Sequence, residues 1–360
     1  MGDILARRLG IIEGFFGEPW SWADRRAVVK KLAPLGYGFY IYAPKADAYL
    51  RKKWQEPYPK KHLKELKKFA RHCKKLGVRV GVGLSPYEAY IDFDDDKKAA
   101  LKSRLKMFDD IGIDDLAILF DDMKGDIPDL AQIQGEIMDF VRENTHADRL
   151  IMCPSYYSDS AILDEVFGQR PDNYLEDLGK VLHPDIEVFW TGEKVCSPAY
   201  SVEHLESVKE RLGRKPFIWD NYPVNDGEKM SKFLHLRGFN NSAKALNSHS
   251  NGHAVNPALQ ARLSLVPAYT LAVSYKNPNT YSPALAFAEG AKKMLGVRVG
   301  SNIIRDVGAF QDKGLDGISD EDKKSLRARY AKIQSPAARE IVRWLDGKYS
   351  THAHEAVLTQ

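Results

Sequence analysis

The stretch LAILFDDMKGD, residues 116–126, decides the fold that we predict for this chain. Its first residues are apolar and indicate a buried strand, which ends in two adjacent carboxylates, Asp121 and Asp122. Parallel strands covered by helices on both faces are hydrophobic nearly throughout, and ligands bind beyond their carboxyl ends. A single Asp after a strand is more often a turn residue or a helix cap. A pair of acids leaving an apolar strand is harder to explain in that way, so we predict a functional site here.

On both sides of this stretch, short apolar segments rich in β-formers alternate with amphipathic segments of helical period. We predict strands at residues 8–17, 38–45, 78–86, 115–122, 149–157, 186–192, 215–223 and 251–259. Helices are expected at 22–36, 61–77, 98–112, 129–144, 174–182, 201–213 and 265–277, with an irregular segment at 225–249. About eight βα units in roughly 275 residues is the usual size of a (β/α)8 TIM barrel. An open doubly wound sheet is the alternative, but no glycine-rich phosphate loop follows the first strand.

The chain therefore divides into a catalytic barrel over residues 1–277 and a helical C-terminal region over 278–360, where the strand pattern is lost. Segments 282–296, 322–335 and 336–347 have helical patterns. Tyr330 and Trp344 stand among apolar neighbours, so these helices either pack on their own barrel, which general burial favours, or form a homodimer contact.

Composition excludes several classes of protein. The chain has 360 residues, 44% of them hydrophobic, and a net charge of +4. Its Lys and Arg residues are spread along the predicted helices, whereas a nucleic-acid interface needs a clustered basic patch, so we expect no nucleic-acid partner. The three cysteines, Cys73, Cys153 and Cys196, are far apart and show no CxxC spacing, which argues against a disulfide framework or a zinc site.

The sequence also predicts where the protein is located. No segment approaches the ~18 apolar residues of a membrane span, and the first residues, MGDILARRLG, lack the apolar core of a signal peptide. We therefore expect a cytoplasmic protein without a membrane partner, unless residues 1–9 replace a removed leader.

Polar and aromatic side chains stand at the carboxyl ends of the predicted strands, the rim on which a barrel builds its active site. In chain order they are Glu13, Lys45, Asp121, Asp122, Tyr156, Tyr157, Trp190, Thr191, Trp219, Asp220, Asn221, Asp226 and Asn256. Carboxylates and amides suit sugar hydroxyls, and aromatic rings suit the C–H faces of a sugar, so the set predicts a carbohydrate pocket. With no Cys and few His on this rim, neither cysteine chemistry nor a histidine-ligated metal is expected.

The adjacency of the two acids restricts the mechanism. Paired acids without metal ligands indicate proton transfer and charge stabilisation, as in glycosidases. Consecutive Cα atoms lie ~3.8 Å apart, so Asp121 and Asp122 cannot easily flank opposite faces of a sugar, as an enzyme nucleophile and an acid must. One acid could protonate the leaving oxygen while its neighbour supports a nucleophile that the substrate supplies, such as a 2-acetamido group.

Seven segments in collinear order resemble the catalytic domain of glycoside hydrolase family 84. They are GIIEGFFGEPWSWADR (10–25), YIYAPKADAYLRKKWQEPYP (40–59), FDDM (120–123), CPSYY (153–157), IEVFWTG (186–192), IWDNYPVND (218–226) and VNP (255–257). That family contains the β-N-acetylglucosaminidases that act as O-GlcNAcases. The resemblance covers roughly residues 7–277 and implies a (β/α)8 barrel, retention through an oxazoline intermediate, no metal or other cofactor, and an N-acetylglucosamine-containing glycoconjugate as the substrate.

The resemblance also implies roles for single residues. Asp121 matches the acid that polarises the acetamido nitrogen, and Asp122 matches the general acid/base. The other matched positions contact the acetamido group (Tyr157, Asn221), hold the ring hydroxyls (Gly10, Lys45, Asp226, Asn256) or line the pocket (Thr191, Trp219). The chain departs from the family at Phe16, where EGFYG is common, and at Ser155 and Tyr156, which leaves the role of the residue before Tyr157 in doubt.

The sequence is compatible with two alternative functions. A non-catalytic sugar-binding barrel would keep the pocket, but intact Asp121 and Asp122 argue against it, because lost acids would mark such a protein. Within the enzymes, a hyaluronan fragment or another amino-sugar glycoside could replace a glycoprotein as the substrate.

Overall fold

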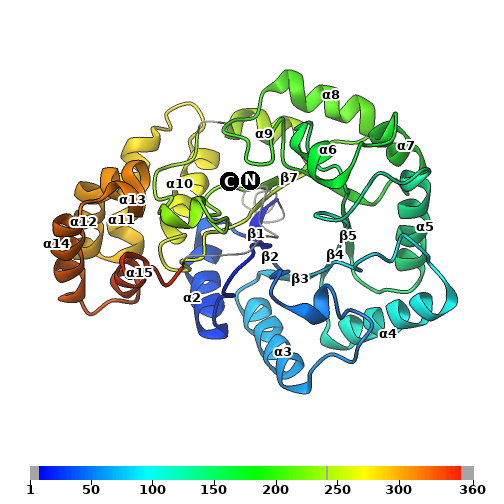
Figure 1. Cartoon of the computed structure of the whole chain (residues 1–360), viewed down its shortest axis with the longest axis horizontal. Coiled ribbons are helices and arrows are strands. Elements are labelled where there is room, and N and C mark those ends of the chain that lie inside the picture. Colours follow the sequence, from blue (N-terminus) through cyan, green and yellow to red (C-terminus); the bar gives the residue numbers. More distant parts are fainter. Residues whose placement is uncertain (1–7, 241, 350–360) are drawn as a thin grey trace.

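A computed structural model of the chain describes residues 8–240 and 242–349. Within these ranges, eight parallel strands form a closed barrel in which each strand pairs with the next and β8 pairs with β1 (Figure 1). The strands are β1 (Leu9–Glu13), β2 (Phe39–Tyr42), β3 (Arg79–Leu84), β4 (Asp115–Leu119), β5 (Arg149–Cys153), β6 (Glu187–Trp190), β7 (Phe217–Asp220) and β8 (Gly252–Val255). The predicted (β/α)8 barrel is confirmed, and each predicted strand contains an observed one and continues into the loop beyond it.

Helices surround the barrel and alternate with its strands (Figure 1). They are α2 (Trp22–Leu32), α3 (Lys60–Lys75), α4 (Asp95–Ile111), α5 (Leu130–Glu143), α6 (Ile162–Phe167), α7 (Tyr174–Val181), α8 (Val202–Leu212), α9 (Ala243–His249) and α10 (Leu265–Lys276). Short 3-10 turns are η1 (Ala33–Leu35), η2 (Ala48–Leu50) and η3 (Met230–Lys232). The helices α6 and α9 were not predicted, because each is only six or seven residues long and shows less than two turns of periodicity.

The strand β4 illustrates why the barrel holds together. All of its residues are buried, since its apolar side chains face the barrel interior on one side and the surrounding helices on the other. Its first residue, Asp115, is also fully buried, and its carboxylate accepts hydrogen bonds from Arg79 and Arg149 at 2.6 Å each. The acid at the amino end of β4 is therefore structural, whereas the two acids beyond the carboxyl end face the pocket described below.

The C-terminal helices gather on one side of the barrel, next to α10 and α2 (Figure 1). They are α11 (Pro283–Leu295), α12 (Val297–Val307), α13 (Gly314–Gly317), α14 (Asp320–Ala331) and α15 (Pro336–Leu345), with a π-helical turn, η4 (Gly308–Lys313), between α12 and α13. The helix α12 was not predicted, because its valines and isoleucines favour strands; Val299 and Ile303, four residues apart, are nevertheless buried on one helical face.

The apolar residues of the C-terminal helices are buried within the chain itself. Tyr330 donates a hydrogen bond to Asp306 at 3.0 Å, and the Trp344 indole donates to the main-chain oxygen of Ser231 at 3.1 Å. Packing on their own barrel is thus the arrangement observed, and the homodimer remains an untested prediction. The boundary predicted at residue 277 falls between α10 and α11, which pack against one another.

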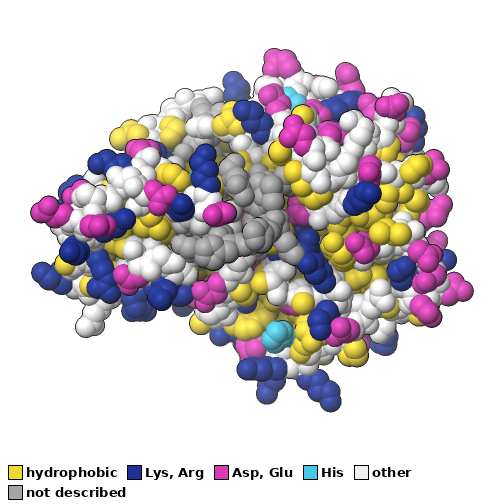
Figure 2. Space-filling view, in the orientation of Figure 1, with side chains coloured by type: hydrophobic (Ala, Val, Ile, Leu, Met, Phe, Trp, Pro, Cys, Tyr) yellow, Lys and Arg dark blue, Asp and Glu magenta, His cyan; other side chains and the backbone are white. Residues whose placement is uncertain are grey.

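The surface of the face shown in Figure 2 carries dark-blue Lys and Arg atoms interspersed with magenta Asp and Glu atoms. None of the described helices is both long enough and apolar enough to cross a membrane. The predictions that concern residues 1–7 and 350–360 lie outside the described part of the chain.

Candidate active site

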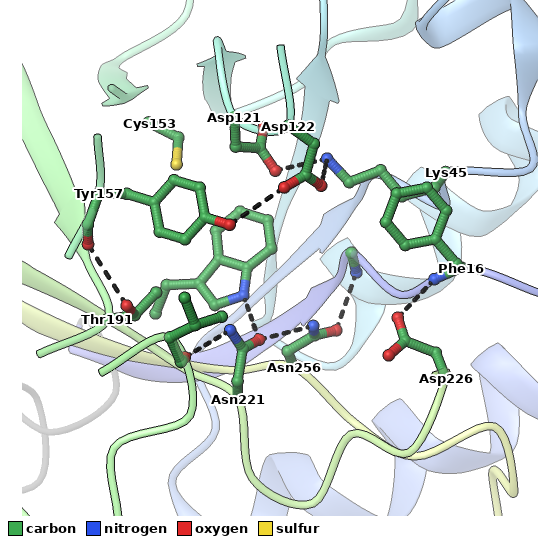
Figure 3. Close-up of a pocket in the computed structure, with 13 residues that line it drawn as sticks. Phe16, Lys45, Asp121, Asp122, Cys153, Tyr157, Thr191, Asn221, Asp226 and Asn256 are labelled. Atoms are coloured by element: carbon green, nitrogen blue, oxygen red, sulfur yellow. Dashed lines mark hydrogen bonds and ion pairs between the residues drawn. The ribbon is translucent and has the colours of Figure 1, made fainter. Parts of the chain in front are cut away.

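A pocket opens at the carboxyl ends of the strands and has about 440 Å³ of empty space, solvent at its mouth included. Most of its walls come from the loops that follow β1, β2, β4, β5, β6, β7 and β8. The strands β5 and β7 themselves contribute one residue each. The lining residues are Gly14, Phe16, Lys45, Asp121, Asp122, Cys153, Tyr157, Thr191, Val195, Trp219, Asn221, Asp226 and Asn256. Of the residues to which the family resemblance assigns a role, all except Gly10 are in this set (Figure 3).

Both acids after β4 face the pocket, although adjacent side chains of an extended strand point to opposite sides. The reason is local. Asp122 has a φ of 57°, in the left-handed region, which Asp tolerates better than most residues, at a cost of roughly 1 kcal/mol. The turn at Asp122 brings its carboxylate beside that of Asp121 (Figure 3).

Lys45 holds the two carboxylates together. Its ammonium donates to Asp121 Oδ2 at 2.5 Å and lies 3.6 Å from Asp122 Oδ2. Burial acts to lower the pKa of Lys45, but the two carboxylates outweigh burial and raise that pKa. The other oxygen of Asp121, Oδ1, is buried and accepts no hydrogen bond from any residue that the structure describes. Asp121 therefore has one fixed oxygen and one acceptor available to a ligand.

Asp122 has different surroundings from Asp121. Its Oδ1 accepts a hydrogen bond from the Tyr157 hydroxyl at 3.0 Å. Burial raises the pKa of Asp122 to about 6, and the charge of Asp121 adds to this effect while Lys45 and Arg51 oppose it. Burial, together with the nearby Asp122 carboxylate, raises the pKa of Tyr157 well above its usual value, so this hydroxyl stays a donor. A carboxyl group with a pKa near 6 can both donate and accept a proton near neutral pH.

A chain of amide hydrogen bonds forms the opposite wall (Figure 3). The Trp219 indole donates to Asn221 Oδ1 at 2.9 Å, and Asn256 donates to the same oxygen at 2.9 Å. Asn221 in turn donates to the Val195 main-chain oxygen at 2.9 Å, and Asn256 accepts from the Gly14 amide at 3.2 Å. Four segments distant in sequence are thereby locked together, which fixes the shape of the pocket before a ligand binds.

The remaining wall joins the loop that follows β1 to the loop that follows β7. Asp226 is buried and accepts a hydrogen bond from the Phe16 amide at 2.8 Å. The Thr191 amide donates to the Tyr157 main-chain oxygen at 2.9 Å, so Thr191 holds the segment that carries Tyr157.

The structure corrects the assignment of Gly10, which it does not bring to the pocket. Gly10 pairs with Phe39 inside the barrel sheet, and a Cβ atom there would lie 2.4 Å from the Phe39 ring. The residue that lines the pocket is Gly14, beyond the end of β1, where a Cβ atom would lie 2.4 Å from the Trp219 ring. Both glycines occur in the quoted segment 10–25, and only their position along the strand distinguishes them.

Several rim residues from the sequence point away from the pocket. Glu13 pairs with Arg25 through two 2.7 Å hydrogen bonds, and Asp220 lies 3.1 Å from His253 Nε2. Tyr156 donates to the Gly168 main-chain oxygen, and Trp190 stacks on His204. In each case the next or preceding residue lines the pocket, as the two-residue period of a strand requires.

One expectation about the rim is wrong, because Cys153 does line the pocket. Cys153 was overlooked as the last residue of an apolar run. Burial, with the nearby Asp121 carboxylate, raises the pKa of its thiol well above the usual value, which favours the neutral thiol over the thiolate. Within the described ranges, no group of three or more His, Cys, Asp and Glu side chains is arranged to hold a metal ion.

Known proteins resemble this chain in sequence and in fold. A family model described as beta-N-acetylglucosaminidase matches residues 9–307, from the start of β1 to the end of α12. Protein O-GlcNAcase of Rattus norvegicus and that of Mus musculus are each 31% identical over 287 residues, which are 76% of this chain and 30% of the relative. The chain thus spans less than a third of the length of these curated relatives.

Solved structures agree with the fold. A mutant of the O-GlcNAc hydrolase of Thermobaculum terrenum superposes with a TM-score of 0.77 at 26% identity, covering 95% of this chain and 81% of that one. The structure of CpGH84B gives a TM-score of 0.76 at 23% identity, covering 96% of this chain and 67% of that one. Because the family model matches most of its length, the chain belongs to the β-N-acetylglucosaminidase family of glycoside hydrolases.

Proposed function

We propose that this chain is a retaining exo-β-N-acetylglucosaminidase that hydrolyses terminal β-linked N-acetylglucosamine by substrate-assisted catalysis through an oxazoline intermediate. The observation that carries the proposal is the different state of two carboxylates on one wall. Asp121 has a buried oxygen with no hydrogen-bond donor among the described residues, and Asp122 has a pKa of about 6.

In the first step, the acetamido N–H of the substrate donates to Asp121 Oδ1, which increases the electron density on the acetamido carbonyl oxygen. That oxygen attacks C1 of the sugar while protonated Asp122 gives its proton to the glycosidic oxygen, and the C1–O bond breaks. The positive charge that develops on the oxazoline ring lies beside Asp121, whose other oxygen stays bonded to Lys45 at 2.5 Å.

In the second step, the ionised Asp122 takes a proton from water, and the water oxygen attacks C1 from the face that the aglycone left. The bond between C1 and the carbonyl oxygen breaks, which restores the acetamido group and the original anomeric configuration. Asp121 and Asp122 leave the same segment, so no protein carboxylate is needed on the opposite face of the sugar. The Tyr157 hydroxyl, which donates to Asp122 at 3.0 Å, holds that carboxylate in place throughout.

The polar wall formed by Asn221, Asp226 and Asn256 supports recognition of the sugar ring, and Trp219 supplies an aromatic surface. Because the relatives carry the name Protein O-GlcNAcase, protein-linked N-acetylglucosamine is the first substrate to try. Oligosaccharides and hyaluronan fragments are the competing substrates. Kinetics on N-acetylglucosamine-modified peptides beside N-acetylglucosamine disaccharides would rank these classes.

The acid role is tested with two aryl N-acetylglucosaminides, one with a poor leaving group and one with an activated leaving group. We expect Asp122→Ala to lower kcat roughly 100-fold or more on the poor leaving group and much less on the activated one, which needs little protonation. Asp121→Asn should lower both, because attack by the acetamido group precedes either departure. Equal loss on both substrates in Asp122→Ala would contradict the acid assignment, and no turnover by the unaltered protein would favour a sugar-binding barrel.

The substrate nucleophile is tested in the unaltered enzyme with N-acetyl, N-fluoroacetyl and N-trifluoroacetyl forms of the activated substrate. Fluorine withdraws electrons from the carbonyl oxygen, so kcat should fall steadily along the series. A rate that does not depend on fluorine content would instead indicate a nucleophile from the protein.

A further inference from the structure

Arg51 lies beside the acid pair without lining the pocket. It follows η2 and is 95% buried, with only 5% of its surface exposed. Its Nη2 donates a long hydrogen bond of 3.4 Å to the main-chain oxygen of Asp122. This hydrogen bond joins a charged side chain to the main chain of Asp122, the left-handed residue whose turn places its carboxylate beside that of Asp121.

Two aromatic rings restrain the guanidinium group. The Arg51 Cζ atom lies 5.5 Å from the centre of the Phe16 ring and 5.3 Å from the centre of the Tyr87 ring. Arg guanidinium groups stack well on aromatic faces, and both rings belong to loops that follow the barrel strands. Phe16 also lines the pocket, so the position of Arg51 is coupled to the pocket wall.

The turn η2, which precedes Arg51, is fixed by hydrogen bonds to Asp47. Asp47 caps η2 by accepting from the Tyr49 amide at 3.2 Å. The carboxylate of Asp47 further accepts hydrogen bonds from the hydroxyls of Tyr42 at 2.9 Å and Tyr58 at 2.6 Å. The turn that presents Arg51 is therefore held by side-chain hydrogen bonds to Asp47, two of which are buried.

We infer that Arg51 is a positioning residue for the reaction: it holds the Asp122 peptide in its left-handed conformation, so that both carboxylates face the bound sugar. The inference rests on the proposed function in one respect, since it takes Asp122 as the general acid. It adds a residue outside the pocket that the reaction depends on.

The charge of Arg51 acts in the same direction as its geometry. The groups that face Asp122 are Asp121 on its own segment, Lys45 after β2, Arg51 after η2, and Cys153 and Tyr157 from β5 and the loop beyond it. Burial raises the pKa of Asp122, with a further contribution from Asp121, and the positive charges of Lys45 and Arg51 limit that rise. Removing Arg51 should therefore raise the pKa of Asp122 further and also loosen its peptide.

The experiment compares Arg51→Met, Arg51→Lys and, as a matched control, Lys52→Met. The control removes the adjacent exposed charge, whose ammonium lies 5.9 Å from the centre of the same Tyr87 ring. The pH dependence of kcat/KM is measured for each on the poor and the activated aryl N-acetylglucosaminide. For Arg51→Met we expect a loss of roughly tenfold or more on the poor leaving group, a smaller loss on the activated one, and a basic limb moved up by roughly half a pH unit or more. Arg51→Lys keeps the charge and should leave the limb in place, and Lys52→Met should match the unaltered enzyme.

Two results would overturn the inference. In the first, Arg51→Met loses kcat/KM equally on both substrates and its basic limb does not move, which indicates a role in folding alone. The other is the same limb shift in Lys52→Met, which indicates a general effect of surface charge. If Arg51→Met does not fold, Arg51→Gln replaces it, because it keeps a planar hydrogen-bond donor while it removes the charge; the limb must still move up.

A failure of the proposed acid role is recognised separately. If Asp122→Ala loses activity equally on both substrates, Asp122 is not the general acid, and its titration is then followed by carbon NMR of labelled Asp carboxyl groups, assigned with Asp122→Asn. A higher pKa of Asp122 in Arg51→Met than in the unaltered protein supports the positioning role. An unchanged pKa in that measurement contradicts it.

Discussion

Asp121 and Asp122 leave the same short segment but meet different partners. Lys45 binds one oxygen of Asp121 at 2.5 Å, whereas Asp122 accepts its hydrogen bond from the neutral hydroxyl of Tyr157 at 3.0 Å. In the mechanism that we propose, this difference separates the tasks of two identical side chains, because burial raises the pKa of Asp122 while the second oxygen of Asp121 is available to accept from a ligand. The left-handed φ of Asp122 makes the arrangement possible.

In the mechanism that we propose, the pH dependence of the reaction follows from Asp122. Its carboxyl group, with a pKa of about 6, has to be protonated to donate to the leaving oxygen. The active form is therefore present below pH 6 and is lost as the pH rises through 6, so kcat/KM on a poor leaving group should fall about tenfold per pH unit above that point. The dependence of kcat/KM on pH in the unaltered enzyme measures this decrease, which is the basic limb of the profile. The profile of Asp122→Ala on the activated substrate should lack the basic limb. A limb that persists in this variant would assign it to another group.

At this scale the sequence predicted the residue types better than their directions. Asp121, Asp122 and Tyr157 lie in the pocket as expected, but Gly10 does not, and Gly14 takes its place. Cys153 was missed because nothing in an apolar run distinguishes the last residue that faces a pocket. Strand residues alternate in direction, so an uncertainty of one residue at a strand end changes which side chain faces the ligand.

At the level of elements, α15 is attached to the loop that leads from β8 into α10. The Glu340 carboxylate accepts hydrogen bonds from the amides of Arg262 and Leu263 at 2.9 and 3.0 Å. Arg262 also donates to Asp24 at the start of α2, at 2.9 Å. The C-terminal helices therefore contact the segment beyond Asn256 and support the pocket wall from outside.

Replacing Glu340 should show what this attachment contributes. Glu340→Ala leaves two main-chain amides without their acceptor, so we expect a loss of about 1–3 kcal/mol in the free energy of unfolding. Chemical denaturation of this variant and of Arg339→Ala, an exposed neighbour on the same helix, measures the difference. Equal stability of the two variants would show that water replaces Glu340 at no cost.

For the whole molecule, the buried apolar residues of the C-terminal helices and those of the barrel form one continuous core. Trp344 lies in this core, with its ring centre 5.6 Å from that of Phe310. We propose that residues 278–349 are an extension that unfolds together with the barrel.

The substitution Trp344→Ala tests this joint unfolding. Removing a fully buried Trp should cost about 3–5 kcal/mol and lower the midpoint of a single transition, whether unfolding is followed by circular dichroism or by loss of activity. Trp344→Phe keeps an aromatic ring but loses the hydrogen bond to Ser231 and part of the ring volume, so its stability should lie between that of Trp344→Ala and that of the unaltered protein. Separate transitions for the two probes would instead show that the C-terminal helices unfold alone.

The sequence by itself determined the alternation of strands and helices, the barrel and the pair of acids, because these depend on local periodicity and on residue type. Only the tertiary structure decided which rim residues converge. The Phe16 amide meets Asp226 across 210 residues, and Asn221 meets Asn256 across 35. These contacts depend on closure of the barrel, and the contact of Arg51 with Asp122 also depends on one left-handed residue. Local periodicity predicts neither feature, because both arise between segments that are distant in sequence or from a single backbone angle.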